Sequence, residues 1–138
     1  MHGNYLTDEE CQFVAQHGSL SIVYCPRTHA YFNHQPHPWQ RLVGMGANVV
    51  IGTDSRASNP DLSVFAELQW LVANTTKPNR QAILKLATSN AARAMRLDGS
   101  TLAIGAIADF SCIGLPDRQG DAFDLLFDAA SQPVELVG

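Results

Sequence analysis

An apolar run followed by an acidic residue is the sequence feature that most constrains how this chain can fold. Residues 49–51 (VVI) are β-branched, and Gly52, Thr53 and Asp54 follow directly. An unbroken apolar run predicts a strand buried on both faces, as in sheets of parallel strands. In such sheets the chemistry lies where the strands end at their carboxyl edge. Asp54 is therefore a candidate metal ligand or proton carrier, although Asp is also common in turns and at helix N-caps.

Size and charge exclude several classes of protein. The 138 residues are 46% apolar and 16% charged, which suits one domain, or a piece of a larger one, with a sizeable core. The net charge is −4 and Lys and Arg do not cluster, so we expect no nucleic-acid partner. No apolar stretch approaches the roughly 20 residues that cross a bilayer, so we expect no membrane partner.

Two sequence features indicate a cytoplasmic protein. The first residues have neither the basic segment nor the apolar segment of a signal peptide. The cysteines, Cys11, Cys25 and Cys112, are odd in number and have no C-x-x-C spacing. We expect them to be reduced, mostly buried thiols rather than a zinc cluster.

Helices and strands alternate along most of the chain. Thr7 and Glu10 form a capping box that starts a helix, which we expect to end with Gly18 in a left-handed conformation. Residues 19–25 (SLSIVYC) then predict a strand. The expected elements that follow are a loop over 26–38, a helix over 39–46, a strand over 47–52, a helix capped by Asn59 that runs to about Asn74, a helix opening at 78–79 and a helix over 89–96.

The character of the chain changes after residue 97. Glycines then separate short β-like runs such as residues 109–113, which predicts a small β appendage. We therefore expect two parts, residues 1–97 and residues 98–138. Only two clear buried strands precede the appendage, and two parallel strands buried on both faces do not form a stable sheet alone. The simplest interpretation is the C-terminal part of a larger α/β barrel.

Motifs stand in a fixed order along the chain: residues 2–10 (HGNYLTDEE), 25–28 (CPRT), 52–59 (GTDSRASN) and 87–94 (ATSNAARA). In this order and spacing they resemble the metal-dependent amidohydrolases, in the branch of deaminases and chlorohydrolases. Residues 99–109 (GSTLAIGAIAD) resemble the turn of that family back into its β-sandwich. The resemblance covers the chain from His2 to about Ile113.

The resemblance implies the C-terminal part of a TIM-type (β/α)8 barrel, about strands six to eight, followed by a few strands of a small β-sandwich. His2 then falls at the end of strand six, residues 21–25 in strand seven and residues 49–54 in strand eight. In the family, the strand-eight Asp binds the metal and handles the proton of the metal-bound water, and Asp54 matches it. The strand-six His binds a second metal or orients water or substrate, and His2 matches it.

These residue types suit a hydrolytic displacement. A divalent metal such as zinc, or alternatively iron, lowers the pKa of its bound water to about 7. A carboxylate can take a proton and later give it to a leaving amine, and a neutral imidazole can orient the water. The resemblance implies that Asp54 and His2 are catalytic residues and metal ligands of a hydrolase that deaminates a purine-like or related heterocycle.

Departures from the family pattern bear on activity. The His-x-His pair of strand one and the strand-five His with its nearby Glu are absent from the sequence. A catalytic zinc needs about three protein ligands, and this chain offers one or two. We expect the chain alone to be inactive, and the alternative function is a truncated remnant that acts at most as a binding or assembly module. Open strand edges predict self-association, or association with the missing N-terminal part of the barrel.

A histidine-rich loop supplies the last candidate. His29, His34 and His37 fit no familiar zinc spacing, so we expect a surface or substrate-facing loop there. Family members often carry Pro-x-Ser-Asn after strand seven, and His29 stands where that Asn usually lies. His29 is therefore a candidate contact to a small heterocyclic substrate. Cys25 has no activating base at a fixed spacing, and we expect a structural thiol.

Overall fold

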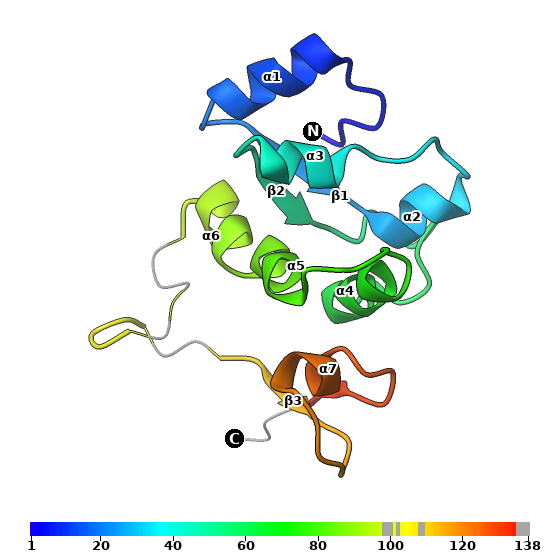
Figure 1. Ribbon diagram of the computed structural model, residues 1–138, viewed down its shortest axis with the longest axis vertical. Coiled ribbons are helices and arrows are strands. Elements are labelled where there is room, and N and C mark those ends of the chain that lie inside the picture. The colour runs from blue at the N-terminus through cyan, green and yellow to red at the C-terminus, as the bar shows by residue number, and fades with distance from the viewer. Residues whose placement is uncertain (98–100, 102, 108–109, 135–138) are drawn as a thin grey trace.

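A pair of parallel strands organises the first part of the chain. The computed structural model describes residues 1–97, 101, 103–107 and 110–134. Strand β1 (Ser21–Tyr24) pairs in parallel with β2 (Asn48–Ile51) along its whole length, so that the first and last residues of the two strands lie opposite each other. Helices lie on both sides of the pair (Figure 1). Because the strands are parallel, their carboxyl ends meet at one edge of the sheet.

The first residues of the chain run along the free edge of β1. The Val23 N–H donates to the Met1 carbonyl over 2.9 Å, and the Met1 ammonium lies 3.4 Å from the Ser21 carbonyl. The order across the sheet is therefore residues 1–2, then β1, then β2. Successive strands of a parallel barrel have this order, which agrees with the arrangement that the sequence predicts.

Helices connect and cover the strands. Their bounds are Asp8–Gln16 for α1, Pro26–Tyr31 for α2, Trp39–Gly44 for α3, Val64–Ala73 for α4, Arg80–Ala87 for α5 and Ser89–Met95 for α6. The capping box of α1 is confirmed: the Glu10 N–H donates to Thr7 Oγ1 over 3.3 Å, and the Thr7 N–H donates to Glu10 Oε2 over 2.8 Å. None of the helices among the described residues is both long and apolar enough to cross a membrane.

Two predictions near β1 were wrong. The expected loop over residues 26–38 contains α2, because Pro26 occupies the first helical turn, where its fixed φ favours a helix. Gly18 is not a left-handed cap: α1 ends at Gln16, and His17 is its C-cap residue with a φ of −109°. The His17 Nδ1 lies 2.7 Å from the Phe13 carbonyl, so a side chain satisfies one helix-end carbonyl there.

The start of α4 also differs from the prediction. Asn59 does not cap this helix, which begins at Val64 with Ser63 as its N-cap. The Ser63 Oγ accepts from the Ala66 N–H over 3.1 Å. The Asn59 side chain is instead buried, and its Nδ2 donates a hydrogen bond to Glu67 Oε1. Tertiary hydrogen bonds have overridden a local capping signal.

The core lies between β2 and the helices that cover it. All residues of β2 are buried, as expected for a strand covered on both faces. Side chains that are almost completely excluded from solvent include Ile22, Leu42, Val49, Leu71, Ile83 and Leu86. This packing fixes the two strands, and with them the segments that leave their carboxyl ends.

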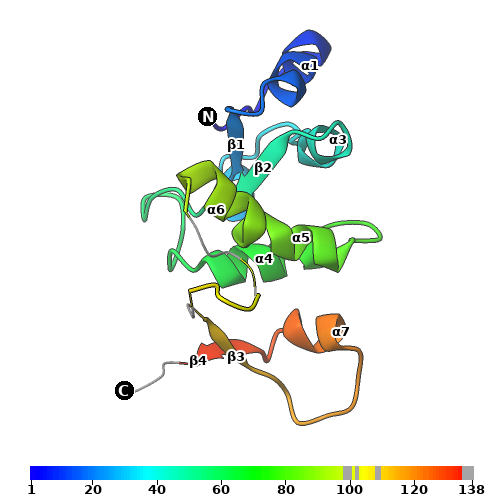
Figure 2. The ribbon, with the colours of Figure 1, turned by 90° about the vertical axis from the view of Figure 1, so that its left-hand side faces the viewer.

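The C-terminal part is only partly the β appendage that the sequence predicts. Strands β3 (Cys112–Gly114) and β4 (Gln132–Val134) pair antiparallel, but helix α7 (Ala122–Leu126) lies between them in sequence. The start of the expected run over 109–113 falls outside the described residues. This unit lies against α4 and α5 (Figure 2), where Phe127 joins the core and Gln69 Nε2 donates to the Asp128 carbonyl over 2.7 Å.

Candidate active site

A pocket of about 90 Å³ lies where β1 and β2 end. Its lining residues are His2, Asn4, Cys25, Thr28, His29, Phe32, His34 and Asp54. The structure therefore brings the predicted site residues His2, His29 and Asp54 to one place. Pockets that enclose a drug-sized ligand usually measure roughly 300–1,000 Å³, so this pocket by itself is too small to enclose one.

Close packing at the end of β2 turns the chain toward this pocket. A Cβ on Gly52 would lie 2.8 Å from Cγ1 of Val23, so only glycine lets the two strand ends approach this closely. Asp54 then has a φ of +58°, a left-handed conformation that Asp tolerates better than most residues. Its side chain is exposed and, among the described residues, forms no ion pair. The Asp54 carboxylate is thus free to bind a ligand or carry a proton.

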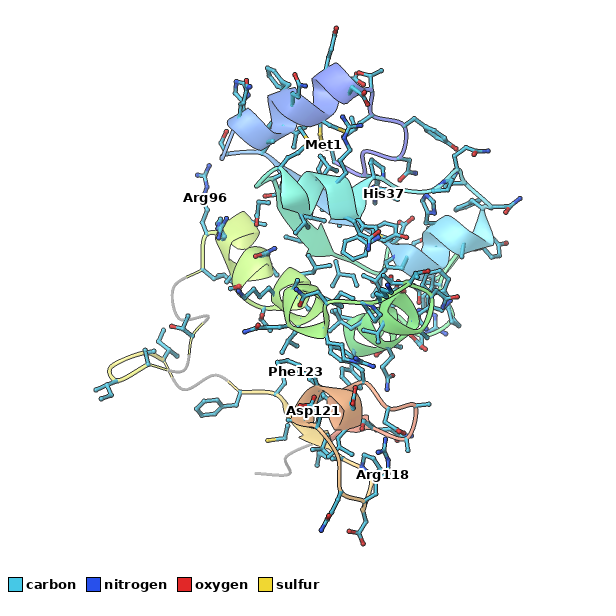
Figure 3. The ribbon with its side chains drawn as sticks, viewed as in Figure 1. Met1, His37, Arg96, Arg118, Asp121 and Phe123 are labelled. Carbon is cyan, nitrogen blue, oxygen red and sulfur yellow. The ribbon has the colours of Figure 1, made fainter. Side chains whose placement is uncertain are left out.

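His2 is oriented by backbone groups of β1. Its Nδ1 lies 3.2 Å from the Val23 carbonyl, which can only accept a hydrogen bond. A neutral His2 therefore carries its proton on Nδ1 and presents the lone pair of Nε2 to a metal or a water. The carbonyl of His2 lies 2.8 Å from Nε2 of His37, whose side chain is drawn beside the N-terminal segment in Figure 3.

The Cys25 thiol is unsuited to nucleophilic attack. Burial, and then the negative charges of Asp54 and Glu67, raise the pKa of Cys25 to about 11. A thiol needs its thiolate form to act as a nucleophile, and Cys25 is protonated at neutral pH. The expectation that Cys25 and Cys11 are buried thiols is confirmed, whereas Cys112 is exposed.

We expect the thiols to react in two classes with a water-soluble disulfide reagent. Cys112 should be modified first in the folded chain, and Cys11 and Cys25 only after unfolding, because their sulfur atoms are buried and Cys25 is protonated. Peptide mapping by mass spectrometry after a short exposure measures the order. A Cys112→Ser variant is the control and should show almost no fast labelling. Modification of Cys25 at the rate of Cys112 would contradict the structural interpretation.

A buried polar network holds the segment that carries Asp54. The Glu67 side chain is fully buried on α4. Its Oε1 accepts from Arg27 Nε over 2.6 Å and from Asn59 Nδ2 over 2.5 Å, and its Oε2 accepts from the Arg27 N–H over 2.9 Å. Asn59 Nδ2 also donates to the Thr53 carbonyl over 2.8 Å, one residue before Asp54. The network therefore ties α2 and α4 to the backbone of the site.

Asp61 closes the network at its solvent side. It pairs with Arg27 at 2.5 Å, and the hydrogen bond from the Arg27 guanidinium holds the pKa of Asp61 at about 2. The structure shows that Glu67 is ion-paired with Arg27. The sequence held one signal of its burial, since Glu67 lies four residues before the apolar Leu71 and so shares a face of the helix with it.

The histidines of residues 29–37 lie in different surroundings. His29 is buried and lines the pocket, while Nδ1 of the less buried His34 lies 2.6 Å from the Tyr5 hydroxyl. His37 stacks on Tyr24 with ring centroids 4.3 Å apart. Burial lowers the pKa of both His29 and His37, so both rings are neutral at neutral pH.

His2 and Asp54 fit two positions of a metal site but do not complete one. An imidazole nitrogen and a carboxylate are ordinary zinc ligands, and both face the same pocket. Within residues 1–97, 101, 103–107 and 110–134, no group of three or more His, Cys, Asp or Glu side chains could hold a metal ion. A catalytic zinc needs about three protein ligands, so further donors would have to come from outside these residues.

Comparison with known proteins identifies the class of protein. The model of the Amidohydrolase family matches residues 1–135. The chain therefore belongs to the amidohydrolase family, whose enzymes are hydrolases.

Similar proteins of this family include several deaminases. The chain is 31% identical over 115 residues to a 5-methylthioadenosine/S-adenosylhomocysteine deaminase of Thermococcus sibiricus, a match that covers 78% of this chain and 27% of the relative. It is 33% identical over 116 residues to a 5'-deoxyadenosine deaminase of Methanoregula boonei, a match covering 78% of this chain and 26% of the relative. The chain spans less than a third of the length of these relatives.

A solved structure has a similar fold. The crystal structure of an adenosine deaminase from Xanthomonas campestris with bound zinc superposes with a TM-score of 0.80 and 29% sequence identity. The match covers 91% of this chain and 31% of that chain. The family assignment and this similarity agree with the partial barrel that the sequence predicts.

Proposed function

We propose that this chain is the C-terminal part, about strands six to eight, of the barrel of a metal-dependent aminohydrolase. Residues 1–97 would belong to the barrel and residues 98–138 to the remnant of a β-sandwich. The substrate would be an adenosine-type nucleoside or a related purine-like heterocycle, and the location cytoplasmic. The single observation that carries this proposal is the pocket at the carboxyl ends of β1 and β2, which the side chains of Asp54 and His2 both line.

The proposed reaction replaces an amino group on a ring carbon by the oxygen of water. The Asp54 carboxylate takes a proton from the attacking water and gives it to the leaving amine, which departs as ammonia when the carbon–nitrogen bond breaks. Nε2 of His2 orients the water or the substrate. A divalent metal such as zinc, when bound, supplies Lewis acidity that lowers the pKa of a water molecule.

Similarity to adenosine-type deaminases supports the choice of substrate class. The relatives named above act, by their names, on adenosine derivatives, and the pocket offers both aromatic and polar side chains to such a ring. No group of three or more metal-binding side chains lies together in the described part of the chain, which favours the second candidate for the chain alone, an inactive module that self-associates or assembles with the rest of a barrel.

The test is to supply the missing part of the barrel. We would join this chain to the preceding barrel segment of the Xanthomonas campestris adenosine deaminase, and we call this protein the fused barrel. We expect the fused barrel to bind zinc and to release ammonia from adenosine or its 5'-substituted derivatives, whereas the chain alone should do neither. A fused barrel that is folded by circular dichroism and loaded with zinc, yet deaminates none of these nucleosides, would contradict the proposal.

A further inference from the structure

The backbone of Asp54 adopts a conformation that its own side chain does not favour. Its φ is +58°, and only glycine adopts this left-handed region without a steric penalty. Such a conformation persists where the surrounding structure enforces it, and it occurs most often at functional sites. The Asp54 side chain is exposed, so its own packing does not enforce the conformation. The contacts that do so therefore act on the neighbouring backbone.

Two buried side chains hold the peptide group that precedes Asp54. The Thr53 carbonyl accepts from Asn59 Nδ2 over 2.8 Å and from Thr28 Oγ1 over 3.2 Å. Asn59 is 3% exposed and Thr28 is 7% exposed, so water competes little for either donor. The donors come from different elements, since Thr28 lies in α2 and Asn59 in the segment before α4. A carbonyl oxygen has two lone pairs, and this one receives two donors.

The planarity of the peptide bond carries this restraint to Asp54. The Thr53 carbonyl and the Asp54 N–H lie in one plane, so holding the carbonyl also fixes the N–H. Thr28 Oγ1 donates to that carbonyl, which can only accept, and the same oxygen lies 3.1 Å from Ser58 Oγ. Ser58 is buried and follows Asp54 by four positions. The backbone is therefore held both before and after Asp54, and the left-handed φ joins these two points.

Asn59 is itself held in one orientation. Its Oδ1 accepts from Arg27 Nη2 over 2.9 Å, which distinguishes the oxygen of the amide from the nitrogen. Its Nδ2 carries two hydrogens, and it donates to Glu67 Oε1 over 2.5 Å as well as to the Thr53 carbonyl. Because both ends of the amide are engaged, the side chain cannot turn away from Thr53 without breaking bonds in a buried place.

We propose that Thr28 and Asn59 are positioning residues, which hold Asp54 in its left-handed conformation and so keep its carboxylate in the pocket that it lines with His2. They act on the Thr53 carbonyl and through it on Asp54. The use of the carboxylate in proton transfer rests on the proposed function. The hold on the backbone is a property of this chain and can be measured without any reaction.

Thr28→Val tests the hold on the 138-residue chain itself. Valine has nearly the shape of threonine but no hydroxyl, so one of the two hydrogen bonds to the Thr53 carbonyl is lost. A strong nuclear Overhauser cross-peak between the amide and α protons of Asp54 reports a positive φ. We expect this cross-peak to weaken in Thr28→Val and to recover in Thr28→Ser, which keeps the hydroxyl. Thr76→Val, in the exposed loop between α4 and α5, is the matched control and should leave it unchanged.

Asn59→Leu removes the other donor. We expect it to weaken the cross-peak more than Thr28→Val does, because it removes the shorter of the two hydrogen bonds. This substitution also takes a partner from Glu67, so circular dichroism has to verify that the variant is folded. Thr28→Val, which leaves the Glu67 contacts intact, is the decisive variant.

The fused barrel supplies a second measurement. There we expect Thr28→Val to lower kcat for nucleoside deamination by roughly 3- to 10-fold and to change KM by less than about 2-fold, since the hydrogen bond acts on Asp54 and not on the substrate. Thr28→Ser should restore most of the rate, and Thr76→Val should match the parent. A change in KM alone would assign Thr28 to substrate contact and overturn its positioning role.

Failure of this inference and failure of the proposed function give different results. A folded Thr28→Val chain with an unchanged Asp54 cross-peak would overturn the inference, even if the fused barrel deaminates nucleosides. A parent fused barrel that is folded and loaded with zinc but inactive would reject the deaminase. In that case the NMR comparison of the 138-residue chains still decides whether Thr28 and Asn59 hold Asp54.

Discussion

Replacing Glu67 by Ala is expected to lower the free energy of unfolding by about 3–5 kcal/mol. The substitution removes the acceptor of three hydrogen bonds, two from Arg27 and one from Asn59, in a place that water does not reach. The Arg27 guanidinium, whose side chain is 13% exposed, would keep Asp61 as its one charged partner among the described residues. Urea unfolding followed by circular dichroism measures the change. The change is large, because the whole free energy of unfolding of a native protein is about 5–15 kcal/mol.

Two further variants separate the charge from the hydrogen bonds and from packing. Glu67→Gln keeps one acceptor oxygen and should lose less than Glu67→Ala. Replacing Arg27 by Met and Glu67 by Leu together removes the ion pair but fills its space, and we expect a smaller loss than for Glu67→Ala. Glu9→Ala, at an exposed position of α1, is the control and should cost at most about 1 kcal/mol. A Glu67→Ala chain as stable as this control would disprove a structural role of the network.

The second large effect concerns Asp54. In the fused barrel, Asp54→Asn should lower kcat/KM for nucleoside deamination by about 10²–10⁴-fold, because a neutral amide cannot accept the proton that the reaction transfers. Asn has nearly the same size and also tolerates a left-handed φ, so the backbone at +58° is retained. Initial rates of ammonia release, with zinc content measured on the same samples, give the change.

The control for Asp54 is a carboxylate of the same kind away from the pocket. Asp117→Asn, in an exposed segment of the C-terminal part, should leave both the rate and the zinc content within about 2-fold of the parent. An Asp54→Asn protein with unchanged kcat/KM would remove Asp54 from the reaction. A loss of zinc together with the rate would assign the residue chiefly to metal binding.

Sequence alone gave the strands and the family, because their signals are local. The β-branched residues before Gly52 and Cys25 favour strands, and the motifs around His2 and Asp54 carry the family resemblance. The same local information failed at Asn59, where capping geometry and a buried network compete for one side chain. The network prevailed, because it satisfies the Glu67 carboxylate, whose burial without partners would cost several kcal/mol.

Only the tertiary structure decided how these residues combine. Parallel pairing of β1 with β2 brings His2, His29 and Asp54 to one pocket, although they are separated by up to 52 positions in the sequence. Among the described residues it also leaves Nε2 of His29 without a hydrogen-bond partner, a property of the folded surroundings that no spacing of residues encodes. The sequence by itself determined where the strands end and which residues follow them, since strand propensity is local. Their approach to one another is determined by packing between distant segments.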